Sequence, residues 1–270
     1  MAVIVHLSDL HFGRVDERLL TPLVAAVEAA RPDVVVVSGD LTQRAHASEF
    51  RAARDFLNRL PRPRLVVPGN HDVPLYNIID RFVRPLAHFR KFIEPDAHPL
   101  FIDAELAVIG VNTARSMVIK NGRINEVQIA AIRAAFSALP AEVCRVVVTH
   151  HPFDVGLTMM EGDRVGRAAL AMRAFAECGV DLLLSGHLHA AYGGEYAPSS
   201  PTLEGFGALA VSAGTATSTR VRGDPNEFNV LRISSSRVEV ERHAWVKNAM
   251  AFERTSVMPF ERCDQRWRRV

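Results

Sequence analysis

The chain has 270 residues, of which 48% are hydrophobic, so it is long enough for one large domain or two small ones. Its formal net charge of +2 gives no bulk electrostatic indication of a nucleic-acid or membrane partner. Three widely spaced cysteines form no C-x-x-C motif, which favours a reducing compartment over a disulfide framework. The sequence shows no signal-peptide pattern and no membrane-length apolar run, so it predicts a cytoplasmic protein.

Strands and helices alternate over the first 70 residues. Continuous apolar runs predict buried strands, and apolar residues at helical spacing predict helices. This alternation indicates an α/β fold in which the strands pair in parallel. The predicted strands are 3–7, 34–37 and 65–67, and the predicted helices are 17–30 and 48–60, the second with Ser48 as its N-cap.

The remainder of the chain predicts further mixed structure and then an antiparallel region. The expected elements are a mostly helical stretch 73–93 broken near Pro85, a hairpin of strands 100–102 and 106–111, a helix 125–139 capped by Asn125, a strand 145–149, a helix 163–178, and strands 180–184, 207–212, 228–233 and 238–245. We expect one domain over residues 1–270, with 246–270 as a C-terminal extension of uncertain role. The arginine-rich residues 261–270 are interpreted as a solvated or frayed tail rather than a binding patch.

Polar side chains follow several of the predicted strands, at the point where each strand ends. Ligands of such sheets collect at the carboxyl ends of the strands, so these motifs should converge. Together they supply aspartates, histidines and one asparagine, which are too many ligands for one tetrahedral zinc and about right for two metals. The motifs are Asp9-x-His11, Gly39-Asp40, Gly69-Asn70-His71-Asp72, His150 and Gly186-His187-x-His189.

These motifs resemble those of the calcineurin-like metallophosphoesterase superfamily, in blocks that span residues 9–189. The aspartate after Gly-Asn-His and the sequence His150-His151-Pro152 resemble the class III cyclic nucleotide phosphodiesterase branch. The resemblance implies a four-layer α-β-β-α sandwich of two mixed sheets flanked by helices. It places a dinuclear metal site at the sheet edge.

Carried over motif by motif, the resemblance also implies a role for each residue. His71 would lie close to the scissile phosphate without binding metal, and Asp72 would support it. The metals would be manganese, iron, zinc or cobalt, because mixed nitrogen and oxygen ligands suit all of these. The resemblance assigns Asp9, His11, Asp40 and His189 to the first metal and Asn70, His150 and His187 to the second, with Asp40 bridging both.

The expected chemistry is hydrolysis of a small phosphodiester, above all a cyclic nucleotide. Two cations ~3.5–4 Å apart can clamp a phosphate and generate a bridging hydroxide that attacks phosphorus. The leaving alkoxide needs a proton, which His71 could supply. Asn70 is a sensible ligand because a neutral amide oxygen limits the anionic charge that faces the substrate.

Some residues near the motifs allow two interpretations. His151 would either contact substrate or orient the loop before Pro152, with equal weight. Asn112 would either line the substrate pocket or form a turn that caps a helix, and the turn is favoured. Residues 157–160 would form an apolar flap over the substrate or pack in the core, and the core is the more common outcome.

Other functions remain open on the same motifs. A lipid-precursor pyrophosphatase would need a basic and apolar lid near the site and attachment to a membrane surface, for which residues 157–167 and the arginine-rich tail leave room. A nuclease would need a basic capping domain, for which the chain is short. A scaffold without activity would be expected to lack ligands or His71, and both are present. The sequence leaves homodimer formation and peripheral membrane association undecided.

Overall fold

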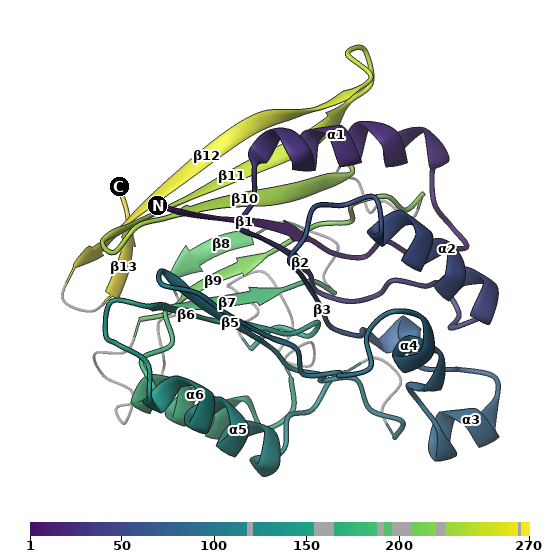
Figure 1. Ribbon diagram of the computed structural model, residues 1–270, viewed down its shortest axis with the longest axis horizontal. Coiled ribbons are helices and arrows are strands. Elements are labelled where there is room, and N and C mark those ends of the chain that lie inside the picture. Colours follow the sequence, from purple (N-terminus) through teal and green to yellow (C-terminus); the bar gives the residue numbers. More distant parts are fainter. Residues whose placement is uncertain (118–120, 154–164, 188–191, 196–206, 220–224, 264–265) are drawn as a thin grey trace.

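The computed structural model describes residues 1–117, 121–153, 165–187, 207–219, 225–263 and 266–270, and the backbone of residues 192–195. Two β-sheets lie face to face, and helices cover both outer faces (Figure 1). This arrangement confirms the predicted four-layer sandwich of two mixed sheets.

The first sheet contains the predicted parallel strands of the N-terminal region. Within the described residues its order is β13-β12-β11-β10-β1-β2-β3. β1 pairs in parallel with β2, and β2 with β3, whereas β1 and β10 are antiparallel, as are the later neighbours. The strands are β1 (Ala2–Leu7), β2 (Val34–Val37), β3 (Arg64–Val66), β10 (Glu227–Ile233), β11 (Arg237–Val246), β12 (Ala251–Cys263) and β13 (Arg266–Arg269).

The second sheet has the order β4-β5-β6-β7-β9-β8 in the described part of the chain. Its four inner strands run parallel, and its two edge strands, β4 and β8, are antiparallel to their neighbours. The strands are β4 (Leu100–Ile102), β5 (Leu106–Gly110), β6 (Cys144–Val148), β7 (Leu182–Ser185), β8 (Tyr192–Glu195) and β9 (Leu209–Ser212). The predicted hairpin of β4 and β5 is therefore present.

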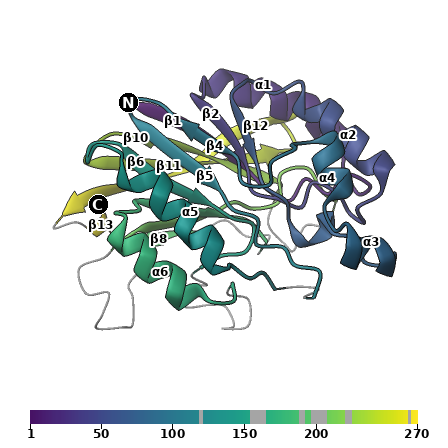
Figure 2. The ribbon, with the colours of Figure 1, turned by 60° about the horizontal axis from the view of Figure 1, so that its bottom comes forward.

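The helices lie on opposite sides of the sandwich. α1 and α2 cover the first sheet, and α5 and α6 cover the second (Figures 1 and 2). α3 projects at the margin of the molecule in both views, at the end opposite the two chain termini. The helices are α1 (Leu20–Ala30) after a 3-10 turn η1 (Glu17–Leu19), α2 (Ala47–Leu57), a 3-10 turn η2 (Asn70–Asp72), α3 (Ile78–Val83), α4 (Ala87–Phe92), α5 (Glu126–Ser137) and α6 (Ala168–Glu177).

Three apolar clusters of described residues hold the four layers together. In β1, Val5 and Leu7 face α1 and α2, whereas Ile4 faces the second sheet. This alternation follows from the two-residue period of a strand, and it explains why both faces of β1 and β2 are apolar. A third cluster joins the other face of the second sheet to α5 and α6, through Phe136 and Phe175 among others.

Helix ends agree with the sequence at α5 and differ at α2. Asn125 caps α5: its Oδ1 accepts the N–H of Gln128 at 2.9 Å, and the Gln128 Oε1 accepts the N–H of Asn125 at 3.0 Å. Ser48, predicted as an N-cap, lies inside α2, whose N-cap is His46. The Glu49 carboxylate accepts the His46 N–H at 3.1 Å, so the acidic residue at the third helical position fixes this start.

The interpretation of residues 261–270 as a solvated or frayed tail is wrong. β12 pairs with β11 over most of its length, and β13 pairs with β12, so this stretch forms the edge of the first sheet. Trp267 is 1% exposed and packs in the cluster between the two sheets. A single apolar residue among arginines gives little periodicity, so the sequence signal for this strand is weak.

Candidate metal centre

The predicted motifs meet because strands of both sheets end at the same edge of the sandwich. Asp9 and His11 follow β1, and Asp40 follows β2, while His150 follows β6 and His187 follows β7. Backbone hydrogen bonds tie the loops together: the His11 N–H donates to the Asp40 carbonyl at 2.9 Å. Across the two sheets, the His187 N–H donates to Asp9 Oδ2 at 3.1 Å.

One cluster of donor atoms comes from the first sheet. Asp9, His11 and Asp40 are buried, and each offers an atom within 4.8 Å of the others. His11 Nε2 lies 3.5 Å from Asp9 Oδ1 and 3.8 Å from Asp40 Oδ2. Two carboxylates and one imidazole are a donor set that suits a divalent transition metal.

A second cluster surrounds His150 Nε2. Asn70 Oδ1 lies 3.1 Å from this nitrogen, His187 Nδ1 lies 3.3 Å from it, and Asp40 Oδ1 lies 3.4 Å from it. Two ligand atoms that each lie ~2.1 Å from one cation are ~3.0–3.4 Å apart in octahedral or tetrahedral geometry. The donor atoms are therefore spaced as the ligands of a single metal are spaced.

Asp40 belongs to both clusters, with one carboxylate oxygen toward each. Burial would raise the pKa of Asp40, but the charge and hydrogen bond of His150, together with His11 and His71, hold it well below its ordinary value. The pKa of His150 rises to about 9, because the interaction with Asp40 outweighs the burial that opposes it. A carboxylate that stays ionised and faces two histidine clusters is suited to bridge two cations.

The tautomer of His150 is fixed by the first sheet. Its Nδ1 lies 2.8 Å from the carbonyl oxygen of Ser38, so Nδ1–H donates and Nε2 is left with a lone pair when the ring is neutral. This bond crosses from the end of β6 to the end of β2. It aims Nε2 at Asn70, His187 and Asp40.

His71 lies beside the clusters and is oriented by a main-chain group. Its Nδ1 lies 2.9 Å from the carbonyl oxygen of Gln43, so Nδ1–H donates and Nε2 is left for proton exchange. The ring packs edge-on against His11, with centroids 5.0 Å apart. The His71 N–H also donates to Asp40 Oδ1 at 2.8 Å, which fixes the start of η2 against the clusters.

Asp72 does not orient the His71 ring as the sequence suggested. Its carboxylate accepts the N–H groups of Gly69, Leu41 and Thr42 at 2.9, 3.1 and 2.9 Å. Burial and the nearby Asp40 raise its pKa to about 6, while these hydrogen bonds act in the opposite direction. Asp72 therefore joins the loop after β2 to the loop after β3.

His151, for which the sequence left substrate contact and loop orientation open, lies with His150 and His187, and the three offer ring nitrogens within 4.8 Å of one another. It is buried, and its ring centroid is 4.7 Å from that of His187 and 4.9 Å from that of His150. Its Nδ1 lies 2.8 Å from the Thr113 hydroxyl. The sequence did not predict the partners of His71, His150 and His151, which are Gln43, Ser38 and Thr113. The first two partners are main-chain carbonyls, and all three contacts depend on which loops meet in the fold.

Asn112 forms a turn, with its Oδ1 accepting the Ala114 N–H at 2.9 Å, but no helix begins at this turn in the described residues, so the predicted helix cap is absent there. It also lines a pocket beside the centre. Two other predictions, the ligand His189 and the apolar stretch 157–160, lie outside the described residues.

Four residues of the centre have a strained backbone. Asp9, His11, Asp40 and His187 all have positive φ angles, between 50° and 72°. Such conformations cost free energy for residues with side chains, and they persist where the surroundings enforce them, often at functional sites. Close packing adds a second constraint, since a Cβ at Gly69 would overlap Asp40 and one at Gly186 would overlap Ser8.

Comparison with known families decides the assignment. The profile of the calcineurin-like phosphoesterase family matches residues 2–191. The chain belongs to this family. The resemblance inferred from the motifs is thus confirmed, and family membership supports the expectation of a metal-dependent hydrolase.

The curated relatives of this chain include proteins named glycerophosphodiester phosphodiesterases and proteins named probable cyclic nucleotide phosphodiesterases. The chain is 27% identical over 179 residues to the glycerophosphodiester phosphodiesterase GpdQ of Enterobacter lignolyticus. The aligned residues cover 59% of this chain and 60% of the relative. The chain is 25% identical over 202 residues to a protein of Rhodopseudomonas palustris named a probable cyclic nucleotide phosphodiesterase, covering 68% and 70% of the two chains. The chain thus spans about 60% of the length of the GpdQ relative.

Solved structures share the fold at low sequence identity. A purple acid phosphatase from yellow lupin seeds superposes with a TM-score of 0.71 at 12% identity, over 96% of this chain and 53% of the other. A dimetal phosphatase from Danio rerio superposes with a TM-score of 0.62 at 15% identity, over 96% and 98%. These similarities establish the metallophosphoesterase fold.

Proposed function

We propose that the protein is a dinuclear metal-dependent phosphodiesterase that hydrolyses a small phosphodiester. The observation that carries this proposal is the position of Asp40, whose two oxygens face two clusters of metal-ligand type. The family assignment and the phosphodiesterase names of the relatives support it. A cyclic nucleotide and a glycerophosphodiester are the two substrate classes to test.

The residues would share the metals as the motifs predict. Asp9 and His11, with His189 from outside the described residues, would hold one cation, and Asn70, His150 and His187 would hold the other. When bound, such a pair of cations offsets the charge of the phosphate and makes a water nucleophilic at neutral pH. The neutral donors Asn70, His150 and His187 keep the total negative charge of the centre low, which favours an anionic substrate.

His71 would act on the leaving group. Gln43 holds its Nδ1–H, so the proton that moves is the one on Nε2. Protonated there, His71 would donate to the departing oxygen, and an alkoxide needs this proton far more than a nitrophenolate does. A partly exposed ring at the rim of the clusters can exchange this proton with water.

The direct experiment is hydrolysis of bis(p-nitrophenyl) phosphate and p-nitrophenyl phosphate by metal-loaded protein. We expect turnover of the diester to exceed that of the monoester, and both to be abolished by a chelator and restored by Mn²⁺. The Asp40→Ala variant should lose both metals and all turnover. A preference for the monoester would contradict the phosphodiesterase assignment, and metal-free turnover would contradict the dinuclear site.

A specific observation favours a second candidate, a pyrophosphatase acting on lipid precursors. The segment 75–83 exposes six large apolar side chains, and exposed Arg84 and Arg90 follow it. This is the basic and apolar surface that such an activity would need, in a different place from the predicted 157–167, most of which lies outside the described residues. Release of a phosphomonoester from a lipid-linked pyrophosphate, without turnover of simple diesters, would favour it.

The remaining predictions concern the whole molecule. No helix in the described part of the chain has the length and hydropathy needed to cross a membrane. We propose that residues 1–270 form a single domain, because β10 to β13 complete the sheet that β1 begins. A cytoplasmic location stays a prediction, to be checked by fractionation. Homodimer formation, which the sequence left undecided, is to be checked by light scattering.

A further inference from the structure

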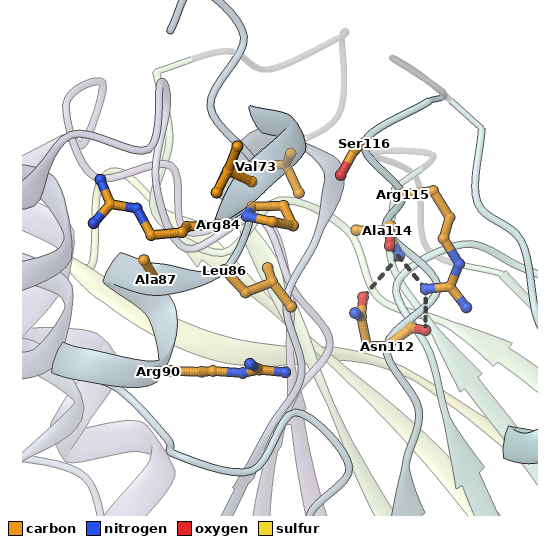
Figure 3. Close-up of a pocket in the computed structure, with 11 residues that line it drawn as sticks. Val73, Arg84, Leu86, Ala87, Arg90, Asn112, Ala114, Arg115 and Ser116 are labelled. Atoms are coloured by element: carbon orange, nitrogen blue, oxygen red, sulfur yellow. Dashed lines mark hydrogen bonds between the residues drawn. The ribbon is translucent and has the colours of Figure 1, made fainter. Parts of the chain in front are cut away.

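A pocket of about 380 Å³ lies next to the metal centre, between the α3–α4 region and the stretch that follows β5 (Figure 3). On each side, its wall includes a residue that is next in the chain to one that contacts the loops of the centre. Val73, in its wall, directly follows Asp72, and Asn112, opposite, directly precedes Thr113, whose hydroxyl contacts His151. The pocket and the centre therefore share the loops that follow β3 and β5.

Arg115 brings a positive charge to one side of the pocket. Its guanidinium donates to the carbonyls of Asn112 and Ala114 at 3.1 and 2.9 Å, on the side of the stretch after β5 that faces away from Arg90 (Figure 3). It also donates to Gln128 Oε1 at 2.6 Å. All three acceptors are neutral, and no ion pair with a carboxylate is found for Arg115 among the described residues. The side chain is about half-buried, so water screens its charge only in part.

Arg90 approaches from the other side. It lies in the last turn of α4 and extends toward the space between α4 and the stretch that follows β5 (Figure 3). Burial lowers the pKa of His98, and Arg115 and Arg90 both lower it further, so both guanidinium groups act on the same region. His98 itself contacts the pocket wall, since its Nδ1 accepts the Asn112 N–H at 3.3 Å.

Nearby carboxylates leave most of this charge uncompensated. Arg84, at the rim, pairs with Asp80 at 2.8 Å. Asp96 accepts the backbone N–H of His98 and raises the pKa of that ring. Neither Asp80 nor Asp96 forms an ion pair with Arg90 or Arg115, so the described residues give the pocket a net positive charge.

Apart from the arginines and the polar residues Asn112 and Ser116, the lining is aliphatic. Its side chains include Val73, Leu86 and Ala114, and none of the described residues in the lining is aromatic. A nucleobase usually stacks on an aromatic ring, so this lining offers it little. An apolar wall strengthens the attraction between a guanidinium and an anion, because it excludes water.

We propose that this pocket binds a second anionic group, a carboxylate or a phosphate, on the substrate arm next to the scissile phosphorus. The proposal rests on the proposed phosphodiesterase function and narrows its substrate class. Diesters with a second negative charge would be preferred over those with a neutral arm. A 3′,5′-cyclic nucleotide, which has one negative charge, would leave Arg90 and Arg115 without a partner.

The test uses three p-nitrophenyl phosphodiesters of equal length. Their second alcohols are 3-hydroxypropionate, propane-1,3-diol and 3-aminopropanol, so the arm is anionic, neutral or cationic. With metal-loaded enzyme, kcat/KM should fall in that order, by about tenfold or more between the first and the last. Equal values for the three diesters would overturn the proposal, and absence of any turnover would instead count against the phosphodiesterase function.

Arginine variants test whether this pocket causes the preference for the anionic arm. Arg90→Gln should remove most of the preference for the anionic arm, and the double variant with Arg115→Gln should remove the rest. Arg173→Gln is the matched control, because Arg173 is an exposed arginine on α6, which covers the outer face of the second sheet. A preference that survives Arg90→Gln and the double variant would place the selectivity elsewhere and overturn the proposal.

A second readout does not require turnover. Phenylglyoxal modifies exposed arginines, and mass spectrometry of the digested protein reports each site. Inorganic phosphate should slow modification of Arg90 while leaving Arg173 unchanged. Equal rates at Arg90 with and without millimolar phosphate would contradict an anion-binding pocket even if the diesters are hydrolysed.

Discussion

His71 and Asp72 are neighbours in the sequence, but their side chains serve different parts of the site. The carbonyl of Gln43 orients the His71 ring, whereas Asp72 accepts hydrogen bonds from main-chain N–H groups of two loops. The sequence indicated an imidazole held by its adjacent carboxylate. Every residue has a main-chain carbonyl, so the sequence pattern does not show which carbonyl accepts a hydrogen bond. Only the folded structure identifies Gln43 as the partner of the His71 ring.

We expect His71→Ala to lower turnover of an alkyl phosphodiester by about 100-fold or more, because the substitution removes the proton donor. Metal content, measured by mass spectrometry of the purified protein, should remain near that of the wild type. His71→Gln, which keeps the volume of the side chain, serves as the control. Loss of metal in both variants would mean that His71 is a ligand.

A second expectation concerns His150, whose pKa rises to about 9 beside Asp40 in the metal-free protein. Below that pH the ring is protonated, and it must lose the proton before Nε2 can bind a metal. Apparent Mn²⁺ affinity should therefore increase with pH, by about tenfold per unit below pH 9 for this one proton. Calorimetric titrations in several buffers would show it, and an affinity that is flat between pH 6.5 and 8.5 would refute it.

Among the elements, α3 and α4 differ in how firmly they pack. Phe89 of α4 is 0% exposed and belongs to the cluster under α2, whereas Phe82 of α3 is 53% exposed. Phe89→Ala should lower the free energy of unfolding by about 3–5 kcal/mol, because it leaves a cavity. Phe82→Ala should change it by less than about 1 kcal/mol.

Urea denaturation of the two variants measures this difference directly, because both lose the same side-chain atoms. Similar losses of stability would mean that α3 is covered by another part of the protein or by a partner. The sequence predicted one mostly helical stretch over 73–93, broken near Pro85, because both halves are apolar. Apolar content alone does not distinguish the buried face of α4 from the exposed face of α3.

The sequence predicted most elements where the signal is local. Apolar runs identified β1 and β2, and Asn125 with Gln128 identified the start of α5, because strand periodicity and capping depend on neighbouring residues. β13 was missed because it is stabilised by pairing with β12 and by Trp267 packing between the sheets. Its pattern, arginines around one aromatic, carries no such local information.

For the whole molecule, the order of strands in the two sheets creates the candidate site. The ends of β1, β2 and β3 in one sheet meet those of β6 and β7 in the other, and bonds such as Ser38 to His150 join the sheets. The sequence could predict that the motifs converge, because ligands collect at strand ends. It could not predict the arginine pocket, because Arg90 and Arg115 come from segments whose positions depend on the packing of both sheets.

The central claim is that Asp40 stands between two cations. Anomalous diffraction from crystals of the protein loaded with Mn²⁺ tests it most directly. We expect two peaks, one among Asp9, His11 and Asp40 and the other among Asn70, His150 and His187, each within bonding distance of an Asp40 oxygen. A single peak, or two peaks of which one lies away from Asp40, would contradict it.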